Sequence, residues 1–504
     1  MQEFGSHFMA DARPSATQPP AGDFLQSSYE LWLVGHQLEN GRAPWLDPYS
    51  FQPEVPQRVN FAGWPFGLPY WPVAAAFGPV VAWNLFVFLS IVAAGLLVCA
   101  WLRELEVARG AALAGGFAFA LAPYRLEQSA GHVLGIVAVL LPLALWSFER
   151  GRRGSSWWFA VSGAALASIP LSGQVNLALG AVPFFAIYAV VRSRRRAALA
   201  ATAAAVLASI AAGLLVQEVA IVGSIGEGGR SLDEVRVHST HISQFVARDP
   251  PLQREQFVYL GWATLLLGAL GLVALLARRR WGLAAVLTGG FLIPALLALG
   301  TNLPSYSWLW HALPPLRYPR VPERLLPIAC LCLAALVGFA VAWGRSRLML
   351  PVLVVALLFI DLRVAIFRPV SSDEANTAYA ALRGRPAGRL LELPVFLPGQ
   401  HFGSVYLYYD MQARLERPGG YSTLAPRDAD RMARRLRPLT CGDWSVHPRA
   451  VRRLGVRYIA VHTGLYEGDV PGNRYCAPIA LHALRTHGFR LIGSDNKIQM
   501  FEAQ

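Results

Sequence analysis

Long apolar stretches alternate with short polar links along most of the chain. A helix needs about 17 to 25 apolar residues to cross a hydrocarbon layer ~30 Å thick. The pattern therefore predicts a polytopic α-helical membrane protein with about 10 transmembrane helices. The predicted spans are residues 77–102, 110–124, 132–148, 156–172, 174–191, 197–216, 256–277, 281–299, 325–343 and 348–367.

The links between these spans predict their orientation. Cytoplasmic loops carry an excess of Lys and Arg, and arginines cluster at every second link of this chain. We therefore expect these links in the cytoplasm, and the intervening loops and both chain ends on the outer side. The arginine-rich links are residues 103–109, 150–153, 192–196, 278–280 and 345–347.

Residues 1–76 form an outward-facing N-terminal segment in this scheme. They are too polar and proline-rich to cross the membrane, so we expect a preceding helix, upstream of about Asp23, that this sequence lacks. Residues 24–40 have the pattern of an amphipathic helix, and residues 41–72 place aromatic residues among prolines. Both features predict that these residues lie in the interface, at the level of the lipid headgroups. The alternative is a cytoplasmic N-terminus, with one short span acting as a re-entrant pair.

Residues 369–504 have a different pattern, which predicts an extracytoplasmic α/β domain and bounds the transmembrane domain at residues 77–368. Cys441 and Cys476 fall in this domain. They are either bridged, as an extracytoplasmic location allows, or two buried thiols. Strand patterns at 389–396, 404–409, 455–462, 489–493 and 497–501 alternate with helical patterns at 373–383, 426–437 and 478–488.

The composition excludes several classes of protein. The 504 residues are 54% hydrophobic and only 15% charged, which excludes a disordered, collagenous or disulfide-caged chain. The net charge of +14 is spread over many short clusters, so we expect no nucleic-acid partner. Lys497 is the only lysine, and HExxH, paired CxxC and nucleophile-elbow motifs are absent. Phosphate-loop, metal-centred and covalent chemistry therefore have no visible support.

Three arginines at the predicted outer end of a span oppose the positive-inside trend. They are Arg317, Arg320 and Arg324, in the run LRYPRVPER. The planar guanidinium fork suits phosphate, and the start of the following helix adds a positive dipole end. The run therefore favours a phosphate or pyrophosphate site. The alternative is contact with membrane lipid headgroups, combined with an internal ion pair to Glu323.

Four stretches of the chain form a recognisable set: GRAPWLDPY at 41–49, which follows Asp23, GGFAFALAPYRLEQSAGH at 115–132, EQFVYLG at 255–261 and RYPRVPERLLP at 317–327. They resemble the C-type (GT-C fold) glycosyltransferase superfamily, including its YfhO-like and uncharacterised bacterial integral-membrane branches. The resemblance covers most of residues 20–370. It implies a sugar transfer from a polyprenyl-phosphate donor to a glycan, lipid or protein acceptor. The reaction is expected at the outer face of the bacterial cytoplasmic (inner) membrane, in cell-envelope assembly.

The resemblance also implies roles for particular residues. A carboxylate of the first loop acts on the acceptor hydroxyl, and we predict Asp23 as this base, with Glu54 and Glu30 as reserves. An inverting hexosyl- or pentosyltransferase needs such a base, and cations that stabilise the departing phosphate. Some members use a divalent metal such as Mg or Mn and others do not, and no ligand spacing in this chain decides it. The predicted phosphate-binding residues are Arg317, Arg320 and Arg324, with Arg125 and His132 as second candidates.

A non-catalytic protein of the same fold is the competing prediction. It would act as a transporter of lipid-linked sugars or as a cell-envelope assembly partner. A transporter is expected to carry ionisable residues near the middle of its spans. Glu218 and Asp361 lie near span ends. Their positions favour a site at the outer surface, and hence an enzyme.

Overall fold

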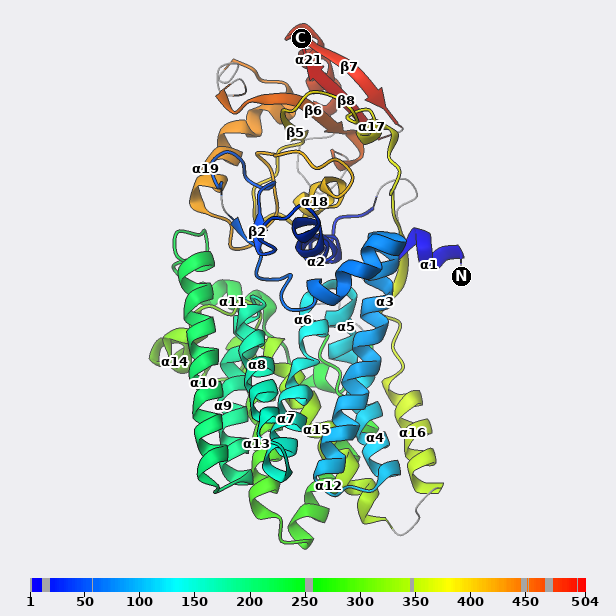
Figure 1. The fold of residues 1–504 in the computed structure, drawn as a ribbon, viewed down its shortest axis with the longest axis vertical. Coiled ribbons are helices and arrows are strands. Elements are labelled where there is room, and N and C mark those ends of the chain that lie inside the picture. The colour runs from blue at the N-terminus through cyan, green and yellow to red at the C-terminus, as the bar shows by residue number, and fades with distance from the viewer. Residues whose placement is uncertain are drawn as a thin grey trace. The chain divides into compact units, whose positions relative to one another are not determined.

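A computed structural model of the chain describes residues 2–10, 19–56, 58–249, 257–344, 349–445, 451, 453–466, 475–495 and 497–504. The chain forms two compact units (Figure 1). The sheet unit comprises Met1–Asn84, Glu218–Glu227 and Phe367–Gln504. The helical unit comprises Leu85–Gln217 and Gly228–Ile366.

The helical unit is built from long apolar helices joined by short links. A helix that begins in the sheet unit, α3, enters it after a break at Gly78, whose φ of 83° is left-handed. The helices are α3 (Gly67–Glu104), α4 (Arg109–Ala120), α5 (Pro123–Gly131), α6 (Val133–Val137), α7 (Leu140–Arg153), α8 (Trp157–Leu171), α9 (Val175–Arg192), α10 (Arg196–Val216), α11 (Leu232–His238), α12 (Trp262–Ala277), α13 (Trp281–Ala298), α14 (Tyr306–Ala312), α15 (Leu326–Trp343) and α16 (Met349–Leu362).

The centre of the helical unit is α15, which is buried along nearly its whole length and packs against α4, α12 and α13. Glycines allow this close packing. A Cβ on Gly271 of α12 would lie 1.9 Å from the Leu336 carbonyl oxygen, and one on Gly115 of α4 would lie 2.8 Å from that of Ala334. Small residues let helix backbones approach in this way in membrane proteins.

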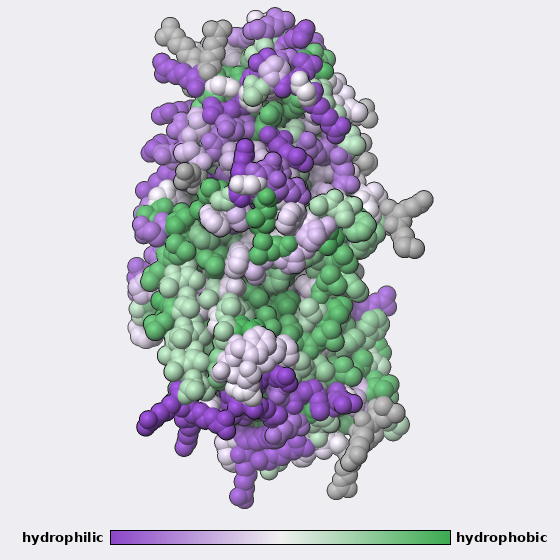
Figure 2. Space-filling view, viewed as in Figure 1, coloured by the Kyte–Doolittle hydropathy of each residue, from purple (hydrophilic) through white to green (hydrophobic). Residues whose placement is uncertain are grey.

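Among the described residues, six helical stretches are long and apolar enough to cross a membrane. They match six of the predicted spans; three further spans form shorter apolar helices, and residues 110–124 form α4, with 12 residues. The count of about 10 therefore stays a prediction. Figure 2 shows hydrophobic side chains over much of the helical unit and hydrophilic ones at its lower end. The six are Gly67–Glu104, Val133–Arg153, Val175–Arg192, Arg196–Ile221, Trp281–Ala298 and Pro322–Trp343.

The sheet unit is organised around a four-stranded sheet in the order β5-β6-β8-β7. β5 and β6 are parallel, and the other pairs are antiparallel. Its core includes Leu391, Ile459 and Phe501 from strands and Leu436 and Leu484 from helices. The elements are α17 (Thr377–Ala380), β5 (Arg389–Leu393), α18 (Ser404–Asp410), α19 (Arg427–Leu436), β6 (Val456–His462), α21 (Cys476–Thr486), β7 (Phe489–Ser494) and β8 (Ile498–Ala503).

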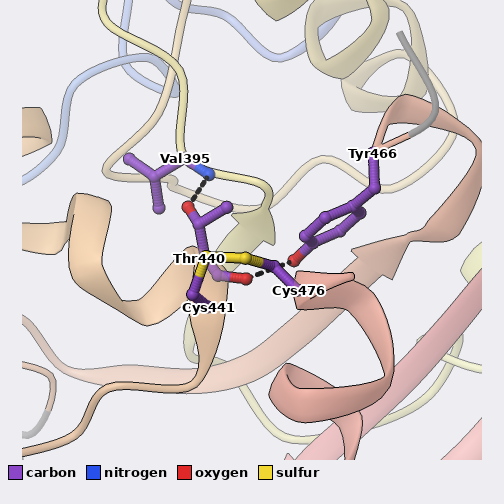
Figure 3. The surroundings of a disulfide bond; sticks show 5 residues. All are labelled: Val395, Thr440, Cys441, Tyr466 and Cys476. Atoms are coloured by element: carbon purple, nitrogen blue, oxygen red, sulfur yellow. Dashed lines mark hydrogen bonds between the residues drawn. A yellow bond between two sulfur atoms is a disulfide. The ribbon is translucent and has the colours of Figure 1, made fainter. Parts of the chain in front are cut away.

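A disulfide joins Cys441 to Cys476 beside this core (Figure 3). Thr440 lies next to the bond, where its hydroxyl accepts from the Val395 amide (2.9 Å) and its carbonyl accepts from the Tyr466 hydroxyl (3.0 Å). The structure thus has the bridged form of the two alternatives that the sequence left open.

The N-terminal residues fold into the same unit as the C-terminal ones. The strand β1 (His7–Ala10), which follows α1 (Gln2–Ser6), pairs with β4 (Arg368–Ser371). The helix α2 (Asp23–Glu39) packs against α18, and the hairpin of β2 (Leu46–Asp47) and β3 (Arg58–Val59) follows it. Because they fold together, we expect both ends of the chain on one side of a membrane.

One strand prediction is wrong. Residues 404–409 form the helix α18, although β-branched and aromatic residues favour strands. Every residue of α18 is buried, so its hydrophobic character reflects burial on all sides. Such a short apolar run cannot be assigned from periodicity alone.

A labelling experiment tests the shared side of the two chain ends. Glu54→Cys and Arg490→Cys place a thiol at exposed positions of the sheet unit, and Arg153→Cys places one at an arginine-rich link. We expect an impermeant maleimide to label the first two in intact spheroplasts, and the third only after permeabilisation.

The labelling experiment requires the removal of one native cysteine. Cys441 and Cys476 are bridged, and Cys330 and Cys332 are buried, so Cys99 is the thiol to replace. Different behaviour of the two sheet-unit positions would contradict a single folded unit. If both sheet-unit positions are protected and Arg153→Cys is labelled, the predicted orientation in the membrane is wrong.

Candidate functional site

The first turn of α2 carries Asp23. A negative side chain is favoured there by the helix dipole, and Asp23 Oδ1 accepts a hydrogen bond from the Tyr421 hydroxyl (2.7 Å). Asp23 is half-buried. Helix α2 and the loop around Tyr421 therefore position this carboxylate together.

Glu30 lies two turns further along α2, on the same face of the helix. Its carboxylate accepts from Gln26 Nε2 (2.9 Å) and lies 3.9 Å from Arg58 Nη2. Burial raises the pKa of Glu30 to about 7, against the opposing charge of Arg58. A carboxyl group with this pKa exchanges its proton readily near neutral pH.

Asp47 is buried beside them. Its Oδ1 accepts from the Tyr29 hydroxyl (2.9 Å) and from the backbone amides of Tyr49 and Ser50, and its Oδ2 pairs with Arg58 Nη1 (3.1 Å). Short polar side chains often close a turn by binding amides two or three residues ahead. The Asp47 carboxylate thereby connects α2 to the following loop.

The buried Arg417 binds two further carboxylates. Its Nη2 donates to Asp410 Oδ1 (2.9 Å), and its Nη1 donates to Glu392 Oε1 and to the Tyr406 carbonyl (2.9 Å). The Arg417 amide also donates to the Tyr49 carbonyl (2.8 Å). This guanidinium therefore connects β5, α18 and the N-terminal loop through one side chain.

Burial dominates the protonation of this network. It raises the pKa of Glu392 to about 7 and raises that of Asp410, while the charge of Arg417 opposes both shifts. Burial and Arg417 lower the pKa of His462 to about 3, so the imidazole that hydrogen bonds to Tyr379 is neutral. The interior of the sheet unit thus contains groups that exchange protons near neutral pH.

The third predicted carboxylate differs from the first two. Glu54 is exposed in the turn that follows Phe51. The sequence analysis did not single out Asp47, Asp410 or Arg417. Asp47 lies within the GRAPWLDPY stretch, whose turn residues were a usable signal, whereas Asp410 ends a run that resembled a strand.

The three arginines of the LRYPRVPER run, in the helical unit, have different surroundings. Arg317 Nη2 donates to the His311 carbonyl (2.9 Å) and its guanidinium lies 5.2 Å from the Trp310 ring centroid, so it stabilises the end of α14. Arg320 and Arg324 instead lie near Arg230. Burial lowers the pKa of Arg230, and the charges of Arg320 and Arg324 add to this effect.

Arg230 reaches this position through a glycine turn. Gly229 has a φ of 76°, and the Arg230 amide donates to the Arg317 carbonyl (2.7 Å). Arg230 also pairs with Glu234 (3.6 Å). The Glu234 carboxylate therefore offsets part of the repulsion that Arg230 meets from Arg320 and Arg324.

Of the second candidates, Arg125 lies within α5 and His132 directly follows this helix. Arg125 is fully buried; its Nη2 donates to the Ser90 carbonyl (2.9 Å), and its Nε and Nη1 have no hydrogen-bond partner among the described residues. The neighbouring Tyr124 lies within electrostatic reach of Arg324. His132 is half-buried at the start of α6.

The predicted residues fall in different units. Asp23, Glu30 and Glu54 belong to the sheet unit, and the predicted phosphate-binding residues belong to the helical unit. In the described part of the chain, no three His, Cys, Asp or Glu side chains are grouped so that they could hold a metal ion.

Comparison with known proteins identifies the fold. No protein-family model and no curated protein matches the sequence. The structure is similar to that of an arabinofuranosyltransferase, AftD, from mycobacteria, with a TM-score of 0.57 and 16% identity. The match covers 98% of this chain and 40% of AftD, so the chain spans about two fifths of that protein.

A second similar structure is the oligosaccharyltransferase of Archaeoglobus fulgidus in its apo form. The TM-score is 0.51 at 11% identity, over 95% of this chain and 70% of that one. Both proteins are glycosyltransferases with the GT-C fold. The chain therefore shares this mostly helical fold, and its described residues include helices long and apolar enough to cross a membrane. Its predicted membership of the YfhO-like branch is not confirmed.

The buried Arg417 network gives a stability prediction. Arg417→Met leaves Asp410 and Glu392 buried without their cation, so the free energy of unfolding of the sheet unit should fall by about 3–5 kcal/mol. Chemical denaturation followed by near-ultraviolet circular dichroism measures the loss. The matched control is Arg434→Met, which breaks an exposed pair with Asp430 on α19 and should cost less than about 1 kcal/mol. Equal costs for both variants would contradict the assigned role.

Proposed function

We propose that this chain is a membrane glycosyltransferase, which transfers a sugar from a polyprenyl-phosphate-linked donor to an acceptor at the outer face of the bacterial cytoplasmic membrane. The observation that carries the proposal is the similarity in fold to an arabinofuranosyltransferase over 98% of this chain. A fold alone does not define an activity, so the carboxylates of α2 and the grouped arginines supply the chemical argument.

The proposed reaction is an inverting transfer with Asp23 as general base. Asp23 takes the proton of the acceptor hydroxyl, and the oxygen of that hydroxyl forms a bond to the anomeric carbon of the donor sugar. The bond from this carbon to the lipid phosphate oxygen breaks, and its electron pair stays on the phosphate. Arginine side chains stabilise the charge that develops there. The sequence predicted Arg317, Arg320 and Arg324 for this role. Because Arg317 binds the end of α14, we assign the role to Arg320 and Arg324, and to Arg230, which interacts electrostatically with both.

Two features support an extracytoplasmic location of the sheet unit. The Cys441–Cys476 disulfide is typical of oxidising compartments. The arginine-rich links, such as residues 150–153 and 192–196, belong to the helical unit, as expected for its cytoplasmic side.

The role of Asp23 is tested by Asp23→Asn. Loss of a general base typically lowers a rate by about 10²–10⁴-fold, and we expect this loss in a transfer assay with a polyprenyl-phosphate sugar donor. The control is Asp233→Asn, which removes an exposed carboxylate paired with Arg236 on α11 and should leave the rate unchanged. Thermal unfolding of both variants checks that the fold is retained.

The competing base is Glu30, and a pH profile distinguishes the two carboxylates. If Glu30 is the base, the wild-type rate should rise with pH through a midpoint of about 7, because its carboxylate forms there. Glu30→Gln would then abolish transfer while Asp23→Asn keeps it. Full activity of Asp23→Asn, Glu30→Gln and Glu54→Gln would refute the proposed mechanism.

The phosphate role is tested by Arg320→Lys, which keeps the charge but loses the planar fork. We expect weaker donor binding, seen as a raised KM for the donor, and a similar effect for Arg230→Lys. The control is Arg236→Lys, an exposed arginine on α11. If Arg320→Ala binds the donor as tightly as wild type, these arginines contact lipid headgroups instead.

A further inference from the structure

The sheet unit contains a cavity whose lining includes none of the catalytic or phosphate-binding residues proposed above. It has a volume of about 410 Å³ and is lined by residues of α2, the first turns of α3, α18 and the segment after α18. Helices α2 and α18 lie side by side (Figure 1). Ligand sites in proteins commonly measure about 300–1,000 Å³, so the cavity has room for a small molecule.

Trp71 forms a fixed aromatic wall of this cavity. Its indole lies so close to α2 that a Cβ on Gly35 would come within 2.3 Å of Trp71 Cδ1. The indole Nε1 also donates to Glu39 Oε1 (2.6 Å). Because these two contacts hold the ring in one orientation, a ligand that packs on it loses little free energy to ordering the protein.

Trp32 and His36 form a second aromatic layer in the cavity wall. Their rings are stacked, with centroids 4.5 Å apart and planes at 10°. His36 Nε2 is hydrogen bonded to the Tyr49 hydroxyl (2.7 Å), and the Arg414 guanidinium lies 5.8 Å from the Trp32 ring centroid. Burial, together with Arg414, lowers the pKa of His36 to about 4, so this layer carries no imidazolium charge at neutral pH.

The charged side chains of the cavity balance one another. Two carboxylates, Glu39 and Glu374, and two guanidinium groups, Arg383 and Arg414, belong to its lining. Carboxylates accept hydrogen bonds and guanidinium groups donate them. Together they suit a ligand that has no net charge and carries many groups able both to donate and to accept.

We propose that this cavity binds a neutral glycan, whose sugar ring packs against Trp71 and whose hydroxyls bind Glu39, Glu374, Arg383 and Arg414. A sugar ring has an apolar C–H face and an edge of hydroxyls, each of which both donates and accepts. An acyl chain would bury these charged groups without partners. The two carboxylates would repel a phosphate group. This inference rests on the proposed function, because we identify the bound glycan as the acceptor of the sugar transfer.

Binding is measured on the full chain without any donor, so that transfer is not needed. The chain is solubilised in an amine-oxide detergent, because maltoside detergents carry a sugar themselves. The probes are short neutral oligosaccharides of pentofuranose or hexopyranose units. Their binding is measured by saturation-transfer NMR. We expect saturable binding by wild type and a dissociation constant at least about tenfold higher for Trp71→Ala, as for an aromatic anchor.

Two further variants and one control define the site. Glu374→Gln removes a hydrogen-bonding charge at constant shape, and Gly35→Ala displaces the Trp71 ring; both should weaken binding. Trp45→Ala removes an indole that is 58% exposed and does not line the cavity, so binding should be unchanged. Because Glu374→Gln keeps the aromatic packing, it tests the site even if Trp71→Ala unfolds.

Three results would overturn the inference. One is the absence of binding by every neutral oligosaccharide, and another is an unchanged dissociation constant in both Trp71→Ala and Glu374→Gln. The third is displacement of the oligosaccharide by phosphatidylglycerol vesicles, which would identify a lipid headgroup site. Glycan binding by a chain that transfers no sugar would leave this inference standing while the proposed function fails.

Discussion

The sheet unit depends on one buried cation. Arg417 is fully buried, and its guanidinium is shared between two carboxylates of the C-terminal part of the chain. Its backbone binds the loop after β2, since its amide donates to the Tyr49 carbonyl and its carbonyl accepts from the Gln52 amide (2.9 Å). Burying an ion costs several kcal/mol unless it is paired. Its two carboxylate partners offset this cost, and its backbone hydrogen bonds connect the same residue to the N-terminal loop, so Arg417 joins the two parts of the chain within the sheet unit.

The candidate site takes its chemistry from this constraint. The loop that Arg417 holds also contains Asp47, which is connected through Arg58 to Glu30. A carboxyl with a pKa of about 7 exists because the surrounding protein excludes water from it. The interior of the sheet unit therefore has two effects, since the burial that stabilises the fold also adjusts the acid strength of a side chain on α2.

The apolar helices and four of the five predicted strands are present in the structure, because hydrophobic periodicity is a local property. The short strands β1 to β4 were not predicted. The sequence also singled out Asp23 and the grouped Arg320 and Arg324 by their unusual positions. It failed where contacts are distant in sequence. The helix α18 resembled a strand because it is buried on every side, and Arg417 resembled any other arginine of a polar loop. Arg317 was grouped with its neighbours because the carbonyls that it binds at the end of α14 cannot be recognised from composition.

The pairing of β1 with β4 has a consequence for the order in which the protein folds. The Ser372 hydroxyl donates to the Ser6 carbonyl across a separation of 366 residues (2.8 Å). At a synthesis rate of about 5–20 residues per second, the first strand waits roughly 20–70 s for its partner. The helices of the helical unit are synthesised during this interval. The N-terminal segment, with its exposed strand edge, therefore needs protection from wrong pairing, and the sheet unit, although first to be synthesised, is the last to be completed.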